Sequence, residues 1–181
     1  MDIYLTIDIN IQLIVENVIK EAVRMYNPEE MMILVEEPNT GEILAMASYP
    51  TFDPANWKAY PQEIYNRNLT IWKSFEPGST FKMVTALTGL KYGIINKNTS
   101  MDCTGIYDYY APSYTPACWQ RAGHGVLDVV GAIENSCNIF FYETGRLAGI
   151  DKLNEVSRKL GLGDYTGIEL ADEVKGVLAG P

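Results

Sequence analysis

Residues 76–82 of the chain read Glu76-Pro77-Gly78-Ser79-Thr80-Phe81-Lys82. The Pro-Gly pair in this stretch predicts the entry to a helix over residues 79–92. Ser79 then lies in the first turn, where free N–H groups and the helix dipole favour a developing negative charge. Lys82 follows one turn later on the same face, so its amine can reach the Ser79 hydroxyl.

The neighbours of Lys82 are largely apolar: Phe81, Met83, Val84 and Leu87. Burial among such side chains lowers the pKa of a lysine and lets its neutral amine act as a general base. This pairing predicts a serine acyl-transfer enzyme that uses lysine in place of histidine. A bare Ser-x-x-Lys pattern arises by chance about once in a chain of this size, so an ordinary surface serine and lysine remain the alternative.

A second polar pair, Ser136 and Asn138, flanks Cys137 at a predicted break between two helices. The Ser136 hydroxyl can relay a proton between a lysine and a leaving group, and the Asn138 amide can bond a substrate carbonyl. The competing interpretation is that these two side chains simply cap helix ends.

The composition of the chain excludes several classes of protein. Of its 181 residues, 47% are apolar and 20% are charged, which indicates a globular domain rather than a disordered chain. Its 14 basic and 23 acidic residues give a net charge of −9, so nucleic acid is not an expected partner. No apolar run of about 18 residues and no signal-peptide pattern occurs, so we expect any membrane anchor outside this sequence.

Hydrophobic periodicity predicts an amphipathic helix over residues 8–26, capped by Asp8. Its buried face is expected to hold Ile11, Ile14, Val15, Val18, Ala22 and Met25. Two strands, Met31–Glu36 and Glu42–Ser48, are expected to form a hairpin around turn residues 38–41. The apolar first strand suggests a sheet covered on both faces.

The middle of the chain shows weaker patterns. Residues 49–70 and 94–125 read as irregular loops. The tyrosines of the second loop could line a substrate groove or simply pack the loop, and no role is assigned to Tyr107, Tyr109, Tyr110 and Tyr114. Helices are expected to resume near Asp128, with Val130 and Ile133 facing inward. After Gly163 the sequence becomes strand-like.

The three cysteines and the single histidine follow one another as Cys103, Cys118, His124 and Cys137. Thiolates and imidazole suit zinc, although these spacings match no standard zinc finger. We hypothesise that Cys103, Cys118 and His124 hold a structural zinc ion, with a fourth ligand from among Asp102, Asp108, Cys137 and water. Two alternatives stay open: buried free thiols in an apolar core, and a disulfide between Cys103 and Cys118.

Further motifs join these in a fixed order: Leu5-Thr6-Ile7-Asp8, Pro38-Asn39-Thr40-Gly41-Glu42-Ile43-Leu44-Ala45-Met46, Ser48-Tyr49-Pro50, Phe52-Asp53-Pro54, Asn66-Arg67, Cys118-Trp119, Gly123-His124-Gly125 and Gly161-Leu162-Gly163. With Ser-x-x-Lys and Ser-x-Asn 57 residues apart (136 − 79), the chain resembles the transpeptidase domain of a class B penicillin-binding protein from a Gram-positive-type bacterium. The resemblance covers essentially the whole chain. It implies an α+β fold of the penicillin-binding transpeptidase and serine β-lactamase type, with two N-terminal strands and a largely helical subdomain. Residues 1–181 would be the N-terminal part of that transpeptidase domain.

The resemblance also implies a function: a D,D-transpeptidase that cross-links peptidoglycan stem peptides and is acylated by β-lactam antibiotics. Ser79 would be the nucleophile, Lys82 the base, Ser136 the proton relay and Asn138 the substrate anchor. The acyl transfer requires no cofactor. Expected partners are stem peptides, β-lactams and other cell-wall synthesis proteins, at the extracytoplasmic face of the bacterial cell membrane.

The sequence departs from the family pattern in one respect. No Lys-Ser/Thr-Gly triad occurs in it, and Lys175-Gly176 lacks the intervening hydroxyl residue. We therefore expect the third motif and later strands beyond Pro181, and expect this chain alone to be inactive. Two other classes remain: a serine β-lactamase, although the Glu-x-x-Leu-Asn loop of class A enzymes is missing, and a non-catalytic β-lactam sensor or scaffold domain.

Overall fold

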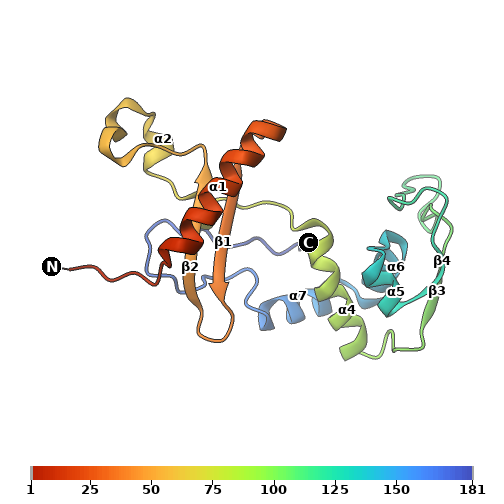
Figure 1. The fold of residues 1–181 in the computed structure, drawn as a ribbon. Coiled ribbons are helices and arrows are strands. Elements are labelled where there is room, and N and C mark those ends of the chain that lie inside the picture. The colour runs from red at the N-terminus through yellow and green to blue at the C-terminus, as the bar shows by residue number, and fades with distance from the viewer. Residues whose placement is uncertain (1, 181) are drawn as a thin grey trace. The chain divides into compact units, whose positions relative to one another are not determined.

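The computed structural model describes residues 2–180, which form two compact units of mixed helix and strand (Figure 1). Unit 1 runs up to Ser74 and includes Ile168–Val174; unit 2 covers Phe75–Gly167 and the residues from Lys175 onward. No helix among residues 2–180 has the length and apolar character needed to cross a membrane. The assignment of residues 1–181 to the N-terminal part of one transpeptidase domain stays a prediction.

Unit 1 opens with helix α1 (Ile9–Tyr26), as expected. The Asp8 carboxylate caps it by accepting from the N–H groups of Asn10 and Ile11 at 2.8 and 3.2 Å. The predicted buried face is partly wrong. Val15 and Ile19 are buried, whereas Ile14, Val18 and Met25 are 62%, 49% and 56% exposed.

The predicted hairpin is confirmed as strands β1 (Met31–Glu37) and β2 (Glu42–Tyr49), which pair antiparallel. Helix α1 lies against this hairpin (Figure 1). The expectation of a sheet covered on both faces is wrong for the described residues, because Leu34 of β1 is 39% exposed. The apolar run of β1 therefore does not indicate a strand that is buried on both faces.

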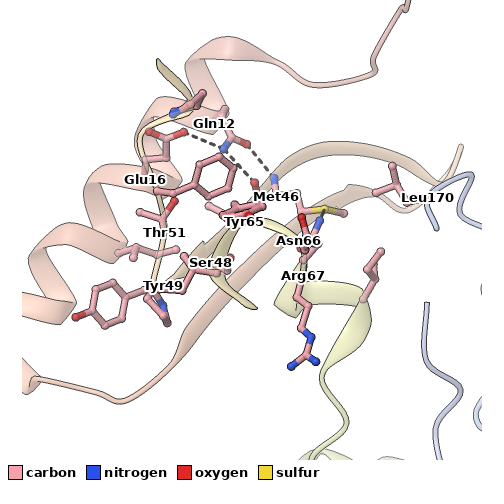
Figure 2. Close-up of a pocket in the computed structure, with 18 of the residues that line it drawn as sticks. Gln12, Glu16, Met46, Ser48, Tyr49, Thr51, Tyr65, Asn66, Arg67 and Leu170 are labelled. Atoms are coloured by element: carbon pink, nitrogen blue, oxygen red, sulfur yellow. Dashed lines mark hydrogen bonds between the residues drawn. The ribbon is translucent and has the colours of Figure 1, made fainter. Parts of the chain in front are cut away.

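Asp8 and Gln12, which we call the N-terminal segment, form hydrogen bonds with the edge of β2 that does not pair with β1. Gln12 Nε2 donates to Met46 O at 3.0 Å, and Met46 N–H donates to Gln12 Oε1 at 2.9 Å (Figure 2). Asp8 N–H also donates to Leu44 O at 2.9 Å. The Gln12 amide thus occupies both backbone groups of Met46, as a neighbouring strand would.

The rest of unit 1 is more ordered than the sequence suggested. The predicted loop contains three short helices: η1 (Pro54–Ala59), α2 (Gln62–Tyr65) and α3 (Leu69–Trp72). Asp53 caps η1 by accepting from Ala55 N–H at 2.9 Å, and Asn68 caps α3 by accepting from Thr70 N–H at 3.1 Å. Helices this short give little periodicity to detect.

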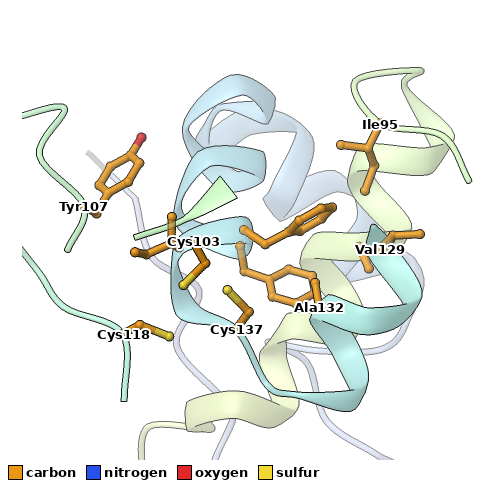
Figure 3. Packing of buried hydrophobic residues seen from close by; sticks show 11 residues of the cluster. Ile95, Cys103, Tyr107, Cys118, Val129, Ala132 and Cys137 are labelled. Carbon is orange, nitrogen blue, oxygen red and sulfur yellow. The ribbon is translucent and has the colours of Figure 1, made fainter. Parts of the chain in front are cut away.

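Unit 2 is mainly helical, with one pair of short antiparallel strands. Its elements are η2 (Gly78–Phe81), α4 (Lys82–Lys91), β3 (Ser100–Cys103), β4 (Gly125–Asp128), α5 (Val129–Glu134), α6 (Asn138–Ala148) and α7 (Ile150–Lys159). Phe140 on α6 packs with Ile95, Val129, Ala132 and the three cysteines in one buried cluster (Figure 3).

Three predictions for unit 2 are wrong. The segment expected to be irregular contains the antiparallel pair β3–β4. Helix α5 buries Val129 and Ala132 to 6% and 0% exposure, not Val130 and Ile133, which are 66% and 40% exposed. The Asp128 carboxylate accepts from Gly131 N–H at 2.8 Å, so the helix begins at Val129 and that register turns Val129 inward. The described chain after Gly163 contains no strand.

Candidate active site

Ser79 lies in η2, the tight turn that leads directly into α4. The preceding Gly78 has φ +57°, a left-handed conformation that glycine adopts without steric cost. Ser79 is exposed, while Val84 and Thr88 anchor α4 in the interior. The hydroxyl is therefore presented to solvent at the first turn of a helix with a fixed position in unit 2.

The amine of Lys82 is surrounded by three acceptors from one distant segment. Its Nζ donates to Ser136 O at 2.7 Å, lies 3.0 Å from Ser136 Oγ and donates to Asn138 Oδ1 at 2.6 Å. Burial lowers the pKa of Lys82 below its ordinary value, and negative charge on Cys118 and Cys137 acts in the opposite direction. The geometry holds the amine in place whichever charge it carries, because the Ser136 hydroxyl can accept from an ammonium or donate to a neutral amine.

Ser136 occupies a strained backbone position between α5 and α6. Its φ is +48°, in the left-handed region that residues with a Cβ seldom adopt. The preceding helix ends at Glu134 and the next begins at Asn138, which confirms the predicted break. This sharp turn brings both the carbonyl and the hydroxyl of Ser136 to the Lys82 amine.

Asn138 is the first residue of α6, and its side chain is held at both ends. Oδ1 accepts from Lys82, while Nδ2 donates to Ala117 O at 3.2 Å. The backbone N–H of Asn138 donates to Cys118 Sγ at 3.4 Å. An amide nitrogen carries two hydrogens, so one Nδ2 hydrogen is left to bind a substrate carbonyl.

The structure thus brings together three of the four predicted site residues: the candidate catalytic residues Lys82 and Ser136 and the candidate substrate anchor Asn138. Ser79 is three positions from Lys82, but among residues 2–180 no hydrogen bond joins the Lys82 amine to the Ser79 hydroxyl. Helical spacing explains why Lys82 and Ser79 are near one another. The contacts of Lys82 with Ser136 and Asn138, 54 and 56 positions further along the chain, depend on the tertiary fold.

The cysteines and histidine form a compact cluster beside this site. One ligand atom from each of Cys103, Cys118, His124 and Cys137 lies within 4.8 Å of all the others. His124 Nδ1 is 3.4 Å from Cys103 Sγ and 3.6 Å from Cys118 Sγ. Figure 3 shows the sulfur atoms of the three cysteines turned toward one another. The candidates Asp102 and Asp108 do not belong to this cluster.

This cluster fits the requirements of a zinc site. Tetrahedral bonds of ordinary length separate a sulfur and a nitrogen ligand by about 3.5 Å, close to the two distances at His124 Nδ1. Although burial raises the pKa of Cys118, N–H donors from Asn138 and Gln120 bring it below the ordinary value. Burial raises the pKa of Cys137 to about 11, so this thiol keeps its proton at neutral pH without a metal and would have to lose it on binding zinc. His124 Nε2 is buried without a hydrogen-bond partner among the described residues. In the tautomer that carries the proton on Nε2, the Nδ1 lone pair faces the sulfurs of Cys103 and Cys118.

A separate pocket of about 840 Å³ lies within unit 1 (Figure 2). Its lining includes Gln12, Tyr49, Tyr65, Arg67 and Leu170, and none of the residues expected to be catalytic. We therefore place the candidate chemistry in unit 2, at Ser79 and Lys82, on the basis of side-chain geometry rather than cavity size.

Comparison with known proteins gives consistent matches. Residues 31–180 match the family described as the penicillin binding protein transpeptidase domain. Stage V sporulation protein D of Bacillus subtilis is 37% identical over 181 residues, covering 98% of this chain and 27% of the relative. The peptidoglycan D,D-transpeptidase MrdA of Acinetobacter baumannii is 32% identical over 193 residues, covering 99% of this chain and 27% of the relative.

A solved structure supports the same relationship. The crystal structure of Pseudomonas aeruginosa PBP2 in complex with WCK 5153 matches with a TM-score of 0.84 and 28% sequence identity. The match covers 98% of this chain and 41% of that chain, and it confirms the expected fold class. The chain spans 27% of the length of the two curated relatives named above.

Proposed function

Because this chain belongs to the transpeptidase domains of class B penicillin-binding proteins, we propose that it supplies the nucleophile and base of a peptidoglycan D,D-transpeptidase. The observation that carries the proposal is the set of contacts made by Lys82 with Ser136 and Asn138, which fixes its amine one helical turn from Ser79. The activity is assigned to the full-length protein, because this chain spans 27% of the length of the two curated relatives.

In the first half-reaction, Ser79 Oγ attacks the carbonyl carbon of the penultimate D-alanine of a stem peptide. Lys82 takes the hydroxyl proton, and the backbone N–H of Ser79 donates to the negative oxygen that develops. The bond to the terminal D-alanine then breaks, and the proton passes to its amine through the Ser136 hydroxyl, which lies 3.0 Å from Lys82 Nζ. The product is an acyl-enzyme on Ser79.

In the second half-reaction, the amine of another stem peptide attacks the acyl carbon and releases Ser79. The proton lost by this amine returns to the Ser79 oxygen through the same Lys82 and Ser136 groups. Asn138 holds the substrate with the Nδ2 hydrogen that Ala117 O does not use. A strained β-lactam amide enters at the first step and remains on Ser79.

The serine β-lactamase alternative is less well supported. Both classes acylate the serine, but a hydrolase must also activate water to release the acyl group. The MrdA relative is named as a D,D-transpeptidase, and the Glu-x-x-Leu-Asn loop of class A enzymes is missing from the sequence. Slow release of bound penicillin distinguishes the transpeptidase, since a β-lactamase turns it over rapidly.

The proposal includes a structural zinc ion held by Cys103, Cys118 and His124, with Cys137 as the fourth ligand. The support is the clustering of one sulfur or nitrogen atom from each residue within 4.8 Å. Bound there, zinc would cross-link the end of β3, the residue before β4 and the residue before α6, and it would take no part in the acyl transfer.

The substrate sets the place of action. Peptidoglycan lies outside the bacterial cell membrane, so the catalytic unit works on the extracytoplasmic face, together with other cell-wall synthesis proteins. The acidic composition, with a net charge of −9, gives no footprint for a nucleic acid.

The test is to incubate the full-length protein with a fluorescent penicillin and to locate the adduct by peptide mass. The adduct is expected on the peptide that contains Ser79, and Ser79→Ala should abolish labelling. Thr80→Ala is the matched control, because Thr80 is the neighbouring hydroxyl and its Oγ1 donates to Pro77 O at 2.7 Å. Labelling that survives Ser79→Ala would refute the assignment.

A further inference from the structure

A chain of contacts in unit 2 connects a group of tyrosines to the Lys82 site. It starts in residues 105–118, which we call the tyrosine hairpin. Its two arms are paired, because Tyr107 N–H donates to Pro116 O at 2.8 Å and Cys118 N–H donates to Gly105 O at 2.9 Å. An anchor on one arm therefore restrains the other arm.

The first arm is anchored to helix α6 through a buried phenol. The Tyr107 side chain is 8% exposed, and its hydroxyl donates to Glu143 Oε2 at 2.5 Å. Arg146 donates to both carboxylate oxygens of Glu143, at 2.8 and 2.6 Å, and lies 4.0 Å from the centre of the Tyr109 ring. Burial raises the pKa of Tyr107 to about 12, so the phenol keeps the proton that it donates.

The second arm meets the same helix five residues earlier, at Asn138. Ala117 O accepts from Asn138 Nδ2 at 3.2 Å, while Lys82 Nζ donates to Asn138 Oδ1 at 2.6 Å. Rotating the amide by half a turn would set its NH₂ against the lysine amine and its oxygen against the Ala117 carbonyl. Both contacts would then be repulsive, so the Ala117 carbonyl helps to select the amide orientation that Lys82 needs.

We propose that Tyr107 is a positioning residue for the Lys82–Asn138 pair, acting through its hydrogen bond to Glu143 and the paired arms of the tyrosine hairpin. The Tyr107–Glu143 bond keeps Ala117 O against the Asn138 amide, and the amide keeps the Lys82 amine in place. This inference rests on the proposed function, because it assigns a role in the acylation of Ser79.

The test uses the full-length protein and stopped-flow kinetics with a fluorescent penicillin. These separate the acylation rate constant at saturation from the dissociation constant of the non-covalent complex. Tyr107→Phe removes only the hydroxyl, and Glu143 keeps Arg146 as a partner. The matched control is Tyr109→Phe, which removes an exposed hydroxyl from the same hairpin and keeps the ring over Arg146.

Tyr107→Phe is expected to lower the acylation rate constant about tenfold, since small misplacements of catalytic groups slow chemistry strongly. A smaller rise in the dissociation constant is expected as well, because Asn138 also holds the substrate. Tyr109→Phe should match the wild type. In an Asn138→Ala background, Tyr107→Phe should have no further effect, because the residue it acts through is gone. General destabilisation would instead slow acylation in both backgrounds.

Two results would overturn the inference: a wild-type acylation rate constant for Tyr107→Phe, or an equal loss with and without Asn138. The first result would mean that the Cys103, Cys118 and His124 cluster at the base of the hairpin holds it unaided. A wild-type protein that is not labelled at Ser79 would refute the proposed function as well. Normal Ser79 labelling with an inert Tyr107→Phe refutes the positioning role alone.

Discussion

The amine of Lys82 lies 2.6 Å from the side-chain oxygen of Asn138, a residue 56 positions further along the chain. This contact joins the first residue of α4 to the first residue of α6. Because Ser79 lies in η2, the turn that leads into α4, the pairing of two helix starts places the proposed nucleophile, base and substrate anchor in one unit.

Replacing Lys82 with alanine should slow the acylation of Ser79 by two to four decades, because general-base catalysis contributes about that much to rate. The measurement is the rate of labelling of the full-length protein by a fluorescent penicillin. Lys91→Ala is a suitable control, since Lys91 lies on the same helix and pairs with Glu155 at 2.8 Å. A Lys82→Ala variant that acylates within about tenfold of the wild type would exclude Lys82 as the base.

Substitutions at Ser136 should separate stability from chemistry. Ser136→Gly relieves the cost of φ +48°, so its free energy of unfolding should exceed that of Ser136→Ala by about 1 kcal/mol. The glycine variant should therefore unfold at the higher temperature. Both variants lose the hydroxyl beside Lys82 and should acylate slowly to a similar degree. Thermal unfolding and penicillin labelling measure the two effects, and a glycine variant with full activity would show that the hydroxyl relays no proton.

Two glycines at the contact of α4 with α6 should respond in opposite directions to alanine. A Cβ on Gly89 would lie 2.7 Å from Thr144 Cγ2 and 2.8 Å from Ile95 Cγ1, so Gly89→Ala should destabilise unit 2 by about 1–3 kcal/mol through overpacking. A Cβ on Gly145 would meet Thr85 Cγ2 at an ordinary 3.8 Å. Gly145→Ala should therefore be neutral or stabilise by up to about 1 kcal/mol through helix propensity. Urea unfolding measures the change in the free energy of unfolding for each variant. Equal changes for Gly89→Ala and Gly145→Ala would contradict the close packing at Gly89.

Removal of zinc should lower the melting temperature of the protein. Elemental analysis after purification without a metal-affinity column should find about one zinc per chain, and a chelator should remove it with loss of stability. Cys137→Ser should weaken zinc retention, whereas Asp108→Asn should not, because Asp108 is not in the cluster. Substoichiometric zinc with an unchanged melting temperature would leave these residues as buried free thiols.

Local signals in the sequence predicted those features that depend on neighbouring residues. Asp8 sets the start of α1, because a capping side chain acts within a few positions. The face of α1 was harder to predict, since its apolar residues form a stripe wider than the contact with β2. Val15 and Ile19 meet the hairpin, and Val18 does not.

In the candidate site, too, local features could be predicted from the sequence and tertiary contacts could not. Ser79 and Lys82 follow from helical spacing, but the partners of Lys82 come from a turn that only tertiary packing brings near. The choice of Cys137 over Asp102 in the thiol cluster likewise needed three-dimensional positions, because β3 turns alternate side chains to opposite sides. No sequence pattern indicated the bond between Tyr107 and Glu143, which joins a loop to a helix.

The bonds from Gln12 to both backbone groups of Met46 have a consequence for the behaviour of the protein in concentrated solution. A strand with a free edge offers its N–H and C=O groups to any passing chain and is a template for aggregation. At Met46 those groups are already taken, and Asp8 occupies the carbonyl of Leu44 on the same edge. The N-terminal segment thus shields β2 against pairing with a second molecule.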